Sequence, residues 1–517
     1  MTLCVALLAT GSAAQTARVS VIPYPASVMP QAGRFVITAT TRVAIADTTN
    51  VELRRLATFA AGAARVADTP VVGAQAGTIR LVLESVRDSA QGAYRLTVHP
   101  TRITIAAAAP QGLFYGIQTL RQLVPAEGER AVTAVEIVDQ PRFGWRGMHL
   151  DVVRHHFPVA FVKRYIDLLA RYKLNTFHWH LTDDQGWRIE IKKYPRLTTV
   201  GGFRRETVVA KNFDPFIGDG VPHGGFYTQD EIRDVVAYAR ERYVTIVPEI
   251  EMPGHSLAAL AAYPELACTP GPFEVGMRWG VYDDVFCPTA RTFAFLEDVL
   301  TEVIALFPGT YVHVGGDEVT KVAWRQSDSA QAVMRREGLK DEHELQSWFI
   351  KRIERFLISK NRRLIGWDEI LEGGLAPEAT VMSWRGTRGG IDAAQQGHDV
   401  IMTPDRPLYF DHYQGDRAVE PMAIGGFNPL EAVYAYEPVP AALTPAQARH
   451  ILGAQANLWT EYITSTAHVE YMALPRMLAL SEVVWSPQSA RDWTSFRARL
   501  DPELAALERL GANYRRP

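Results

Sequence analysis

The chain has little cysteine, no large net charge and no long apolar run. Its 3 cysteines in 517 residues are too few for the dense disulfide framework of a small secreted scaffold. The formal net charge of -3 gives no electrostatic reason to expect binding to nucleic acid or to a membrane surface. No apolar stretch reaches the length of about 20 residues that a helix needs to cross a bilayer. These features leave a globular protein, and its length predicts more than one domain, or one barrel with an appendage.

Residues 1–15 form a short apolar run that ends in small residues, as at the end of a secretory signal peptide. A positively charged leader is missing, so we interpret the run as a truncated signal with cleavage near Ala13 or Ala14. The expected location is therefore periplasmic or extracellular. Cys4 would leave with the signal, and the remaining pair, Cys268 and Cys287, predicts one disulfide. The alternative is two unpaired buried thiols.

Residues 19–140 have the pattern of a mixed α+β domain. A helix is predicted over residues 112–123, where Leu113, Ile117 and Leu120 lie on one stripe. Short runs rich in β-branched and apolar residues predict strands at residues 35–38, 79–83, 94–98 and 102–106, the last two as a hairpin. No acid or base constellation occurs in this part, so its expected role is structural.

From residue 142 onward, predicted strands alternate with predicted helices, the pattern of a parallel sheet closed by helical crossovers. Eight strands over residues 142–490 predict a TIM (β/α)8 barrel, in which chemistry sits at the C-terminal ends of the strands. Residues 491–517 predict a C-terminal helix that packs on the barrel. The expected strand starts are Gly144, Asn175, Thr245, Tyr311, Arg363, Thr380, Asp399 and Gly453.

The strand that begins at Tyr311 is followed by Gly315, Gly316, Asp317 and Glu318. Two glycines let the backbone pass close to a ligand, and two adjacent carboxylates repel each other unless water, a cation or a substrate separates them. An isolated Asp-Glu pair is usually a solvated helix cap. The strand and the Gly-Gly step before this pair favour a functional site instead.

Polar and aromatic residues also follow nearly every other predicted strand, which is difficult to explain by core packing alone. The residues at these strand ends include Arg146, His149, Asp151, His178, His180, Asp183, Glu249, Glu251, His255, Trp367, Trp384, Tyr409, Asp411, Trp459 and Glu461.

The segment His313-Val314-Gly315-Gly316-Asp317-Glu318 resembles the His-x-Gly-Gly-Asp-Glu signature of glycoside hydrolase family 20, the β-N-acetylhexosaminidases. The other strand ends match the pattern of that family in order over about residues 142–485. The resemblance implies an exo-acting enzyme that needs no cofactor or metal. Its substrate would be an oligosaccharide or glycoconjugate with a terminal β-linked N-acetylglucosamine or N-acetylgalactosamine. Cleavage would proceed with retention through an oxazolinium intermediate formed by the substrate's own 2-acetamido group.

The resemblance also assigns roles to single residues. Glu318 would be the proton donor, and Asp317 would orient the acetamido group. A proton donor must be protonated at the working pH, so partial burial and the neighbouring Asp317 charge are expected to raise the pKa of Glu318. Tyr409 would donate to the acetamido carbonyl, while Asp183 and His255 would form a relay towards the acid. The role of Glu251 stays open. The implied sugar-binding residues are Arg146, Asp411 and Glu461 for the hydroxyls and Trp367, Trp384 and Trp459 for the pocket walls.

Two other functions are alternatives to a glycoside hydrolase. The pair His178 and His180 on a barrel strand superficially resembles the metal site of an amidohydrolase, although such a pair is expected on the first strand with an Asp on the last. A catalytically inactive sugar-binding barrel is the other alternative, and the intact Asp317, Glu318 and Tyr409 argue against it. The sequence does not distinguish a gluco from a galacto preference and does not give the oligomeric state.

Overall fold

A computed structural model of the protein describes residues 19–73, 75–86 and 91–517. The predicted signal peptide, with Cys4, lies outside the described residues. The chain forms two compact units, one built on Pro25–Gln140 and one on Pro141–Pro517 together with Ile22–Tyr24.

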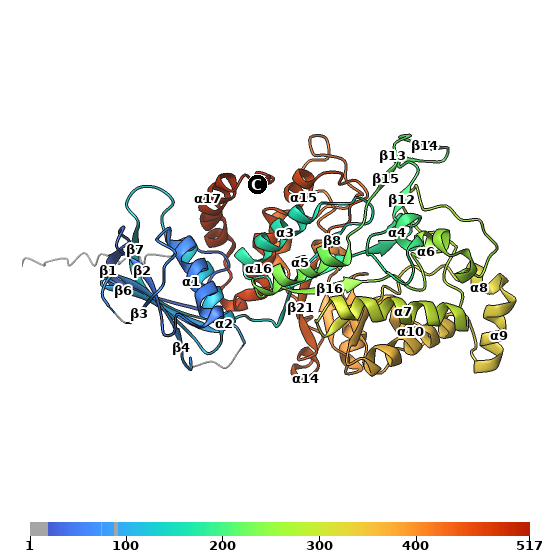
Figure 1. The fold of residues 1–517 in the computed structure, drawn as a ribbon, viewed down its shortest axis with the longest axis horizontal. Helices are drawn as coiled ribbons and strands as arrows, with labels where there is room; N and C mark the ends of the chain where they lie inside the picture. The colour runs from blue at the N-terminus through green and yellow to red at the C-terminus, as the bar shows by residue number, and fades with distance from the viewer. Residues whose placement is uncertain (1–18, 74, 87–90) are drawn as a thin grey trace, which may run out of the picture. The chain divides into compact units, whose positions relative to one another are not determined.

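The first unit contains a seven-stranded sheet with the strand order β1-β7-β5-β6-β4-β2-β3. Helices α1 (Val51–Ala64) and α2 (Pro110–Leu123) pack on one face of this sheet (Figure 1). The strands are β1 (Ser27–Val36), β2 (Arg42–Ile45), β3 (Val71–Val72), β4 (Thr78–Leu83), β5 (Tyr94–His99), β6 (Arg102–Ala107) and β7 (Ala131–Asp139). The predicted α+β domain and its β5–β6 hairpin are confirmed.

Two glycines allow α2 to lie close to the sheet. A Cβ atom on Gly112 would be 2.3 Å from the carbonyl oxygen of Ala93, and one on Gly116 would be 2.4 Å from Cγ2 of Ile105. Larger residues at these positions would push the helix away from β5 and β6. The close approach buries Leu113, whose exposed fraction is zero.

The second unit is a closed barrel of eight parallel strands, in the order β16-β17-β18-β19-β20-β21-β8-β9. The predicted TIM barrel is confirmed, and every strand starts within two residues of its expected position. The strands are β8 (Trp145–Asp151), β9 (Thr176–His180), β16 (Thr245–Glu249), β17 (Tyr311–His313), β18 (Arg363–Trp367), β19 (Thr380–Ser383), β20 (Val400–Met402) and β21 (Ile451–Ala456).

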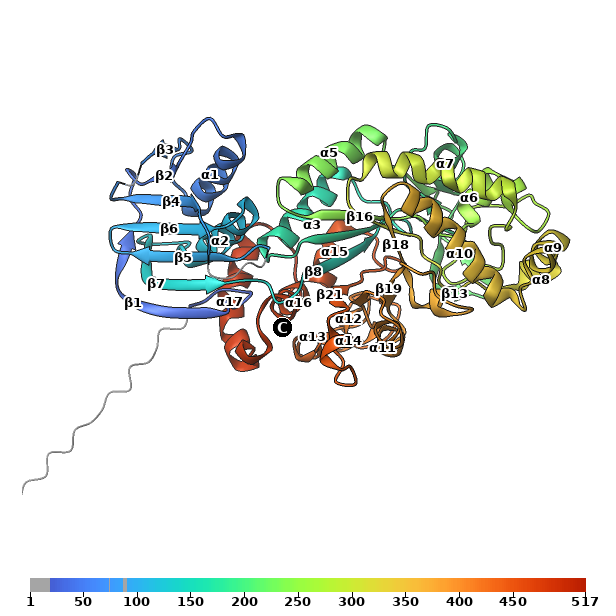
Figure 2. The same cartoon turned by 90° about the horizontal axis from the view of Figure 1, so that it is seen from below.

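Helices lie outside the barrel strands, as Figure 2 shows for α5, α7 and α10. Helix α5 starts with a capping box, in which the Thr228 hydroxyl accepts from the Glu231 amide and the Glu231 carboxylate accepts from the Thr228 amide. The outer helices are α3 (Val159–Arg171), α5 (Gln229–Arg240), α7 (Ala290–Leu306), α10 (Glu342–Ser359), α11 (Arg388–Gln395) and α16 (Arg476–Trp485). The connection from β18 to β19 is shorter and contains the 3₁₀ turn η2 (Asp368–Leu371).

The final helix, α17 (Trp493–Arg509), belongs to the barrel unit. Its predicted apolar stripe is buried, including Phe496 and Leu500. An ion pair of 2.7 Å between Arg499 and Glu482 ties α17 to α16. Within the part of the chain that the structure describes, no helix is both long and apolar enough to span a membrane.

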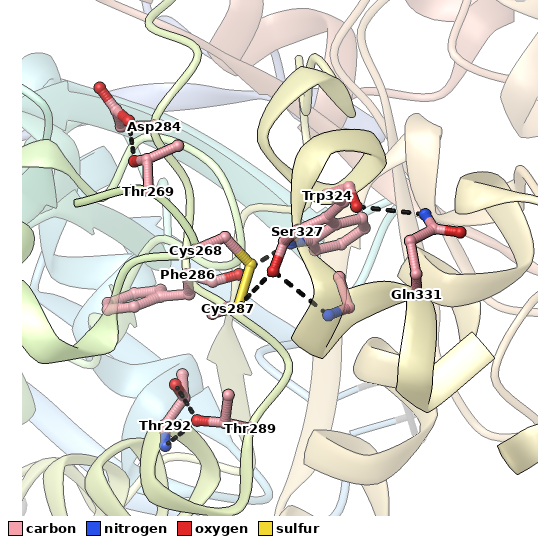
Figure 3. Close-up of a disulfide and its surroundings, with 11 residues drawn as sticks. Cys268, Thr269, Asp284, Phe286, Cys287, Thr289, Thr292, Trp324, Ser327 and Gln331 are labelled. Carbon is pink, nitrogen blue, oxygen red and sulfur yellow. Dashed lines mark hydrogen bonds between the residues drawn. A yellow bond between two sulfur atoms is a disulfide. The ribbon is translucent and has the colours of Figure 1, made fainter. Parts of the chain in front are cut away.

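Cys268 and Cys287 form the predicted disulfide, which closes a loop across a sequence separation of 19. This loop, residues 268–287, follows β16 and is called the disulfide loop below. Figure 3 shows the bridge beside Ser327, whose Oγ lies 3.7 Å from Sγ of Cys287. The Trp324 indole donates to the carbonyl oxygen of Phe286 over 3.0 Å, so the base of the loop is held against the segment that follows β17.

Candidate active site

A cavity of about 600 Å³ opens at the C-terminal ends of the barrel strands. Its volume is typical of a small-molecule site. Nine of the eleven predicted catalytic and substrate-binding residues line it, and Asp183 and Arg146 do not. The nine are His255, Asp317, Glu318, Trp367, Trp384, Tyr409, Asp411, Trp459 and Glu461.

The turn after β17 presents the two adjacent carboxylates to this cavity. Gly315 and Gly316 have φ values of 68° and 92°, and Glu318 itself has a φ of 50°. Only glycine adopts such angles without strain, and a Cβ on Gly315 would lie 1.7 Å from Oε2 of Glu251. The Gly-Gly step is therefore needed for the turn, and it positions Asp317 and Glu318 at the strand end.

His255 joins the catalytic carboxylates to a second acidic pair. Its Nε2 lies 3.4 Å from Oδ2 of Asp317 and 3.5 Å from Oε2 of Glu318. Its Nδ1 lies 3.2 Å from Oδ1 of Asp183 and 3.1 Å from Oδ2 of Asp184. Burial disfavours the charged ring, but Asp183 and Asp317 raise the pKa of His255 well above its ordinary value. The geometry is that of a proton relay ending at Glu318.

Two buried carboxylates hold the Arg154 guanidinium, Asp183 at 2.8 Å and Asp151 at 3.3 Å.

 The guanidinium carbon of Arg154 also lies 5.1 Å from the centre of the Trp459 ring. These contacts hold the Arg154 side chain at the cavity wall, where it is among the lining residues. A fixed guanidinium at this position can donate to ligand hydroxyls.

Three carboxylates that line the cavity have oxygens with no hydrogen-bond partner among the described residues. These atoms are Oδ1 of Asp317, Oδ1 of Asp411 and Oε2 of Glu461, and all three are buried. Burial raises the pKa of Asp411 and that of Glu461. Buried acceptors without donors are costly, so these oxygens are suited to a ligand that brings several hydroxyl or amide donors.

Aromatic residues form the walls, and buried acids fix two of them. Trp367 Nε1 donates to Glu249 over 2.9 Å, and Trp384 Nε1 donates to Glu369 over 2.9 Å. The Trp384 ring is stacked near Tyr409, with centroids 6.1 Å apart. Burial raises the pKa of Tyr409 well above its ordinary value, so its phenol remains a hydrogen-bond donor.

The histidine pair of β9 surrounds Glu249 instead of facing the cavity. His178 Nε2 lies 3.2 Å from Glu249, and Nδ1 of His180 forms a short hydrogen bond with the same carboxylate. Ligand atoms of His149, His178 and Glu249 lie within 4.8 Å of one another, close enough to hold a metal ion. None of these three residues is among those that line the cavity, whereas a catalytic metal needs an open position for substrate. The pair His178 and His180, on which the amidohydrolase alternative was based, therefore does not face the cavity.

Comparison with protein families identifies the chain. Residues 143–488 match the model of glycosyl hydrolase family 20, catalytic domain, and residues 18–140 match that of glycosyl hydrolase family 20, domain 2. The chain belongs to glycosyl hydrolase family 20.

Relatives of this family 20 chain are named β-hexosaminidases. It is 53% identical to the β-hexosaminidase of Porphyromonas gingivalis over 434 residues, which are 82% of this chain and 54% of that relative. It is 33% identical to the β-N-acetylhexosaminidase of Cellulomonas fimi, with 96% of both chains covered. A solved structure of a mutant Streptomyces plicatus β-hexosaminidase in complex with its product N-acetylglucosamine is 34% identical, with a TM-score of 0.83 and 97% of both chains covered.

The structure corrects one substrate-binding assignment in the family 20 chain. Arg146 is the second residue of β8, at the opposite end of the strand from the cavity. Its guanidinium donates to the carbonyl oxygens of Lys173 and Phe143, each over 2.8 Å, and only 2% of the residue is exposed. Arg146 therefore supports the barrel. Arg154, which the sequence analysis missed, is the arginine that lines the cavity, three residues after Asp151 at the end of the strand.

The expected raised pKa of Glu318 is also wrong for the unliganded family 20 site. The hydrogen bond to His255 lowers the pKa of Glu318 and outweighs the effect of its burial. The side chain is 41% exposed. These two pKa shifts favour a proton on His255 over one on Glu318, and burial of Glu318 beneath a sugar would favour transfer of that proton to the acid.

This proton distribution predicts a pH effect. The pKa of His255 is raised, so the His255–Glu318 pair should keep its shared proton above pH 6.5, the ordinary histidine value. In His255→Gln the proton on the imidazole is gone, and Glu318 titrates as a single carboxyl group without the hydrogen bond that lowers its pKa. We expect the alkaline limb of the kcat/KM profile to move to lower pH by about one unit or more.

The measurement is kcat/KM against pH for wild type and variant on one substrate. His343→Gln replaces a half-exposed histidine outside the cavity and should leave the profile unchanged. An alkaline limb that stays in place, or moves to higher pH, in His255→Gln would show that His255 does not supply the proton.

Proposed function

We propose that the protein is an exo-acting β-N-acetylhexosaminidase. It would release the terminal, non-reducing N-acetylhexosamine from β-linked oligosaccharides or glycoconjugates with retention of configuration. One observation carries the proposal. The unpaired oxygens of Asp317, Asp411 and Glu461 belong to residues that line the same cavity as the acid Glu318. A terminal sugar with a 2-acetamido group supplies donors for all three carboxylates.

The proposed reaction begins with attack of the substrate's acetamido oxygen on the anomeric carbon. The bond to the leaving oxygen breaks, and that oxygen takes the proton of Glu318. Family 20 enzymes are an established exception to the scheme in which a protein carboxylate is the nucleophile. Asp317 would accept the acetamido N–H and stabilise the positive charge of the oxazolinium ring, while the Tyr409 hydroxyl would donate to the acetamido oxygen.

The second step restores the enzyme. Glu318, now a carboxylate, would take a proton from water as the water oxygen attacks the anomeric carbon. The oxazolinium ring then opens and the sugar leaves with its original configuration. Trp367, Trp384 and Trp459 line the same cavity and would exclude bulk water from the cyclic intermediate.

Arg154, Asp411 and Glu461 would hold the sugar hydroxyls farthest from the bond that breaks. Charged side chains around those hydroxyls would leave no space for a further sugar, which supports exo action. The disulfide between Cys268 and Cys287 supports the proposal that the protein works in an oxidising compartment outside the cytoplasm.

The test is a release assay with three chromogenic substrates, the β-N-acetylglucosaminide, the β-N-acetylgalactosaminide and the plain β-glucoside. We expect release from at least the first, and none from the glucoside, because it lacks the internal nucleophile. Proton NMR of the first product formed should detect the β-anomer. Cleavage of the glucoside at a comparable rate, or the α-anomer as first product, would overturn the proposal.

A further inference from the structure

The barrel unit contains a second cavity, of about 270 Å³, away from the active-site cavity. Helix α13 (Leu430–Ala435), the 3₁₀ turn η3 (Gln488–Ala490) and the start of α17 contribute to it. Its size is near the lower end of the range of about 300–1,000 Å³ for small-molecule sites, which suits a single ring. The residues that line it are Glu431, Tyr434, Ala435, Gln488, Arg491 and Trp493.

This second cavity lies towards the N-terminal ends of the barrel strands. Glu437, which follows α13, pairs with Arg491 at 2.9 Å and with Arg142 at 2.5 Å. Arg142 precedes β8, so these contacts place the second cavity near the start of that strand. The active-site cavity, to which the disulfide loop contributes Trp279, lies at the other end of the barrel, and none of the described residues lines both cavities. One ligand therefore does not block the other.

Two of the residues that line the second cavity are aromatic, and packing fixes both rings. The Tyr434 ring centroid lies 5.5 Å from that of Trp493 and 4.6 Å from that of Phe496. The Tyr434 hydroxyl donates to Glu482 over 2.9 Å. Trp493 is stacked near Phe496, with centroids 5.8 Å apart, and remains partly exposed. A fixed and partly exposed indole at a cavity offers a flat apolar face to a ligand.

Arg491 brings to the second cavity a buried donor that lacks an acceptor. Only 9% of its side chain is exposed, yet its Nε has no hydrogen-bond partner among the described residues. Nη1 donates to the carbonyl oxygen of Tyr436 over 2.8 Å, and Nη2 donates to Glu437 over 2.9 Å. A buried N–H group without an acceptor is costly, so a ligand oxygen there would be favourable. Glu431 and Gln488 are exposed and add a carboxylate and an amide to the lining.

The charges around the second cavity favour a neutral ligand. An anion beside Arg491 would be repelled by Glu431 and Glu437. A cation on the Trp493 ring would be repelled by Arg491 and by Arg497, whose guanidinium carbon lies 5.9 Å from the ring centre. A sugar ring carries no charge, and its C–H face is apolar. Its hydroxyls can both accept from an arginine and donate to a carboxylate, so it uses every group that the cavity offers.

We propose that the second cavity is a carbohydrate-binding site, separate from the active site, that takes one neutral sugar ring. The C–H face of the ring packs on Trp493, while its hydroxyls accept from Nε of Arg491 and donate to Glu431. The site goes beyond the proposed function, because binding here breaks no bond. A sugar held at this end of the barrel would keep the protein on a glycan while the active-site cavity stays open.

Fluorine NMR of protein labelled with fluorotryptophan measures binding at this site directly. The Trp493 resonance is the one that is lost in Trp493→Phe. We expect it to shift saturably with at least one of N-acetylglucosamine, glucose and galactose, with the millimolar dissociation constant usual for one small ring. The shift should persist when a thiazoline analogue of the cyclic intermediate fills the active-site cavity.

Two variants test the polar contacts of the second cavity. Glu431→Ala removes an exposed carboxylate and should weaken sugar binding about tenfold, as expected for one hydrogen bond to a charged group. Arg491→Lys keeps a positive charge beside Glu437 but lacks the Nε–H donor, and should weaken binding similarly. Asp501→Ala is the matched control, since Asp501 is an exposed carboxylate on α17 that does not line the cavity. Its affinity should equal that of wild type.

The proposal is overturned if none of the three sugars shifts the Trp493 resonance saturably, or if Glu431→Ala binds as tightly as wild type. A stronger response to inorganic phosphate or to tetramethylammonium would also overturn it, because the ligand would then be an anion or a cation. Loss of the shift when the thiazoline is bound would place the sugar in the active-site cavity instead. If the release assay detects no cleavage of any glycoside, the proposed function fails, whereas the sugar titration still decides this site.

Discussion

Glu318→Gln should reduce turnover of an N-acetylglucosaminide with a poor, alkyl leaving group by about 10²–10⁴-fold. A nitrophenyl glycoside should lose far less, since its leaving oxygen needs little protonation. Glu318 is in the right place for this role, because its carboxylate lies in the cavity 3.5 Å from Nε2 of His255. Steady-state kcat and kcat/KM for the two substrates measure the difference.

Glu508→Gln serves as the control for this result, because Glu508 is a half-exposed carboxylate on α17. It should not affect either substrate. Similar losses on both leaving groups in Glu318→Gln would mean that Glu318 does not act as the general acid. Exogenous azide should not restore turnover of the alkyl glycoside, because azide replaces a nucleophile or base and not the missing proton.

Asp317→Asn should lower kcat by about 10²–10³-fold, the range for removal of one electrostatic stabiliser of a transition state. The effect is specific to the acetamido group. In wild type, fluorines on the acetyl methyl weaken the internal nucleophile, so log kcat should fall steadily with the number of fluorines. In Asp317→Asn this dependence should become flatter, because the charge on the amide is no longer stabilised.

A thiazoline analogue of the cyclic intermediate adds a binding measurement that does not depend on turnover. It should bind wild type far more tightly than product does, and Asp317→Asn should lose most of that advantage. Asp234→Asn changes a carboxylate that is 60% exposed and should leave both measurements unchanged. If wild type shows no fluorine dependence, a protein nucleophile must be sought, and Asp411 and Glu461 are the first candidates.

Periodicity and turn residues were sufficient to predict the barrel, and the resemblance to family 20 supplied most of the cavity residues. The β17 strand could be recognised because Tyr311 to Val314 are followed by two glycines, and the backbone angles at Gly315 and Gly316 show why glycine is required. The disulfide followed from counting two cysteines beyond the predicted signal. These features depend on local sequence, which is why the sequence alone revealed them.

The Arg146 assignment failed because it depended on the position of a residue along its strand. Arg146 and Arg154 both belong to the first strand and the turn after it, and the sequence does not show which end of β8 each occupies. The strand runs to Asp151, so the cavity arginine had to follow that residue.

The prediction of a raised pKa for Glu318 was wrong for a different reason. The expected burial of the acid and the charge of the adjacent Asp317 both predict a raised pKa, and both can be argued from the sequence. The hydrogen bond from His255, 63 positions earlier in the chain, reverses the direction. Only the tertiary structure brings these two side chains together. The hydrogen bond between Lys211 and the carbonyl oxygen of Ile424, over 2.8 Å, likewise joins distant parts of the chain.

The hairpin of β13 (Val208–Phe213) and β14 (Phe216–Gly218) and the catalytic residues occupy different parts of the chain, and this separation has an evolutionary consequence. Asp317, Tyr409 and Glu461 belong to the connections after β17, β20 and β21, while Phe213 lies at the turn of the hairpin. Insertions or deletions in that hairpin would alter the part of the cavity lining that Phe213 contributes without moving the residues that break the bond. Related enzymes can therefore diverge in substrate preference while the reaction that they catalyse stays the same.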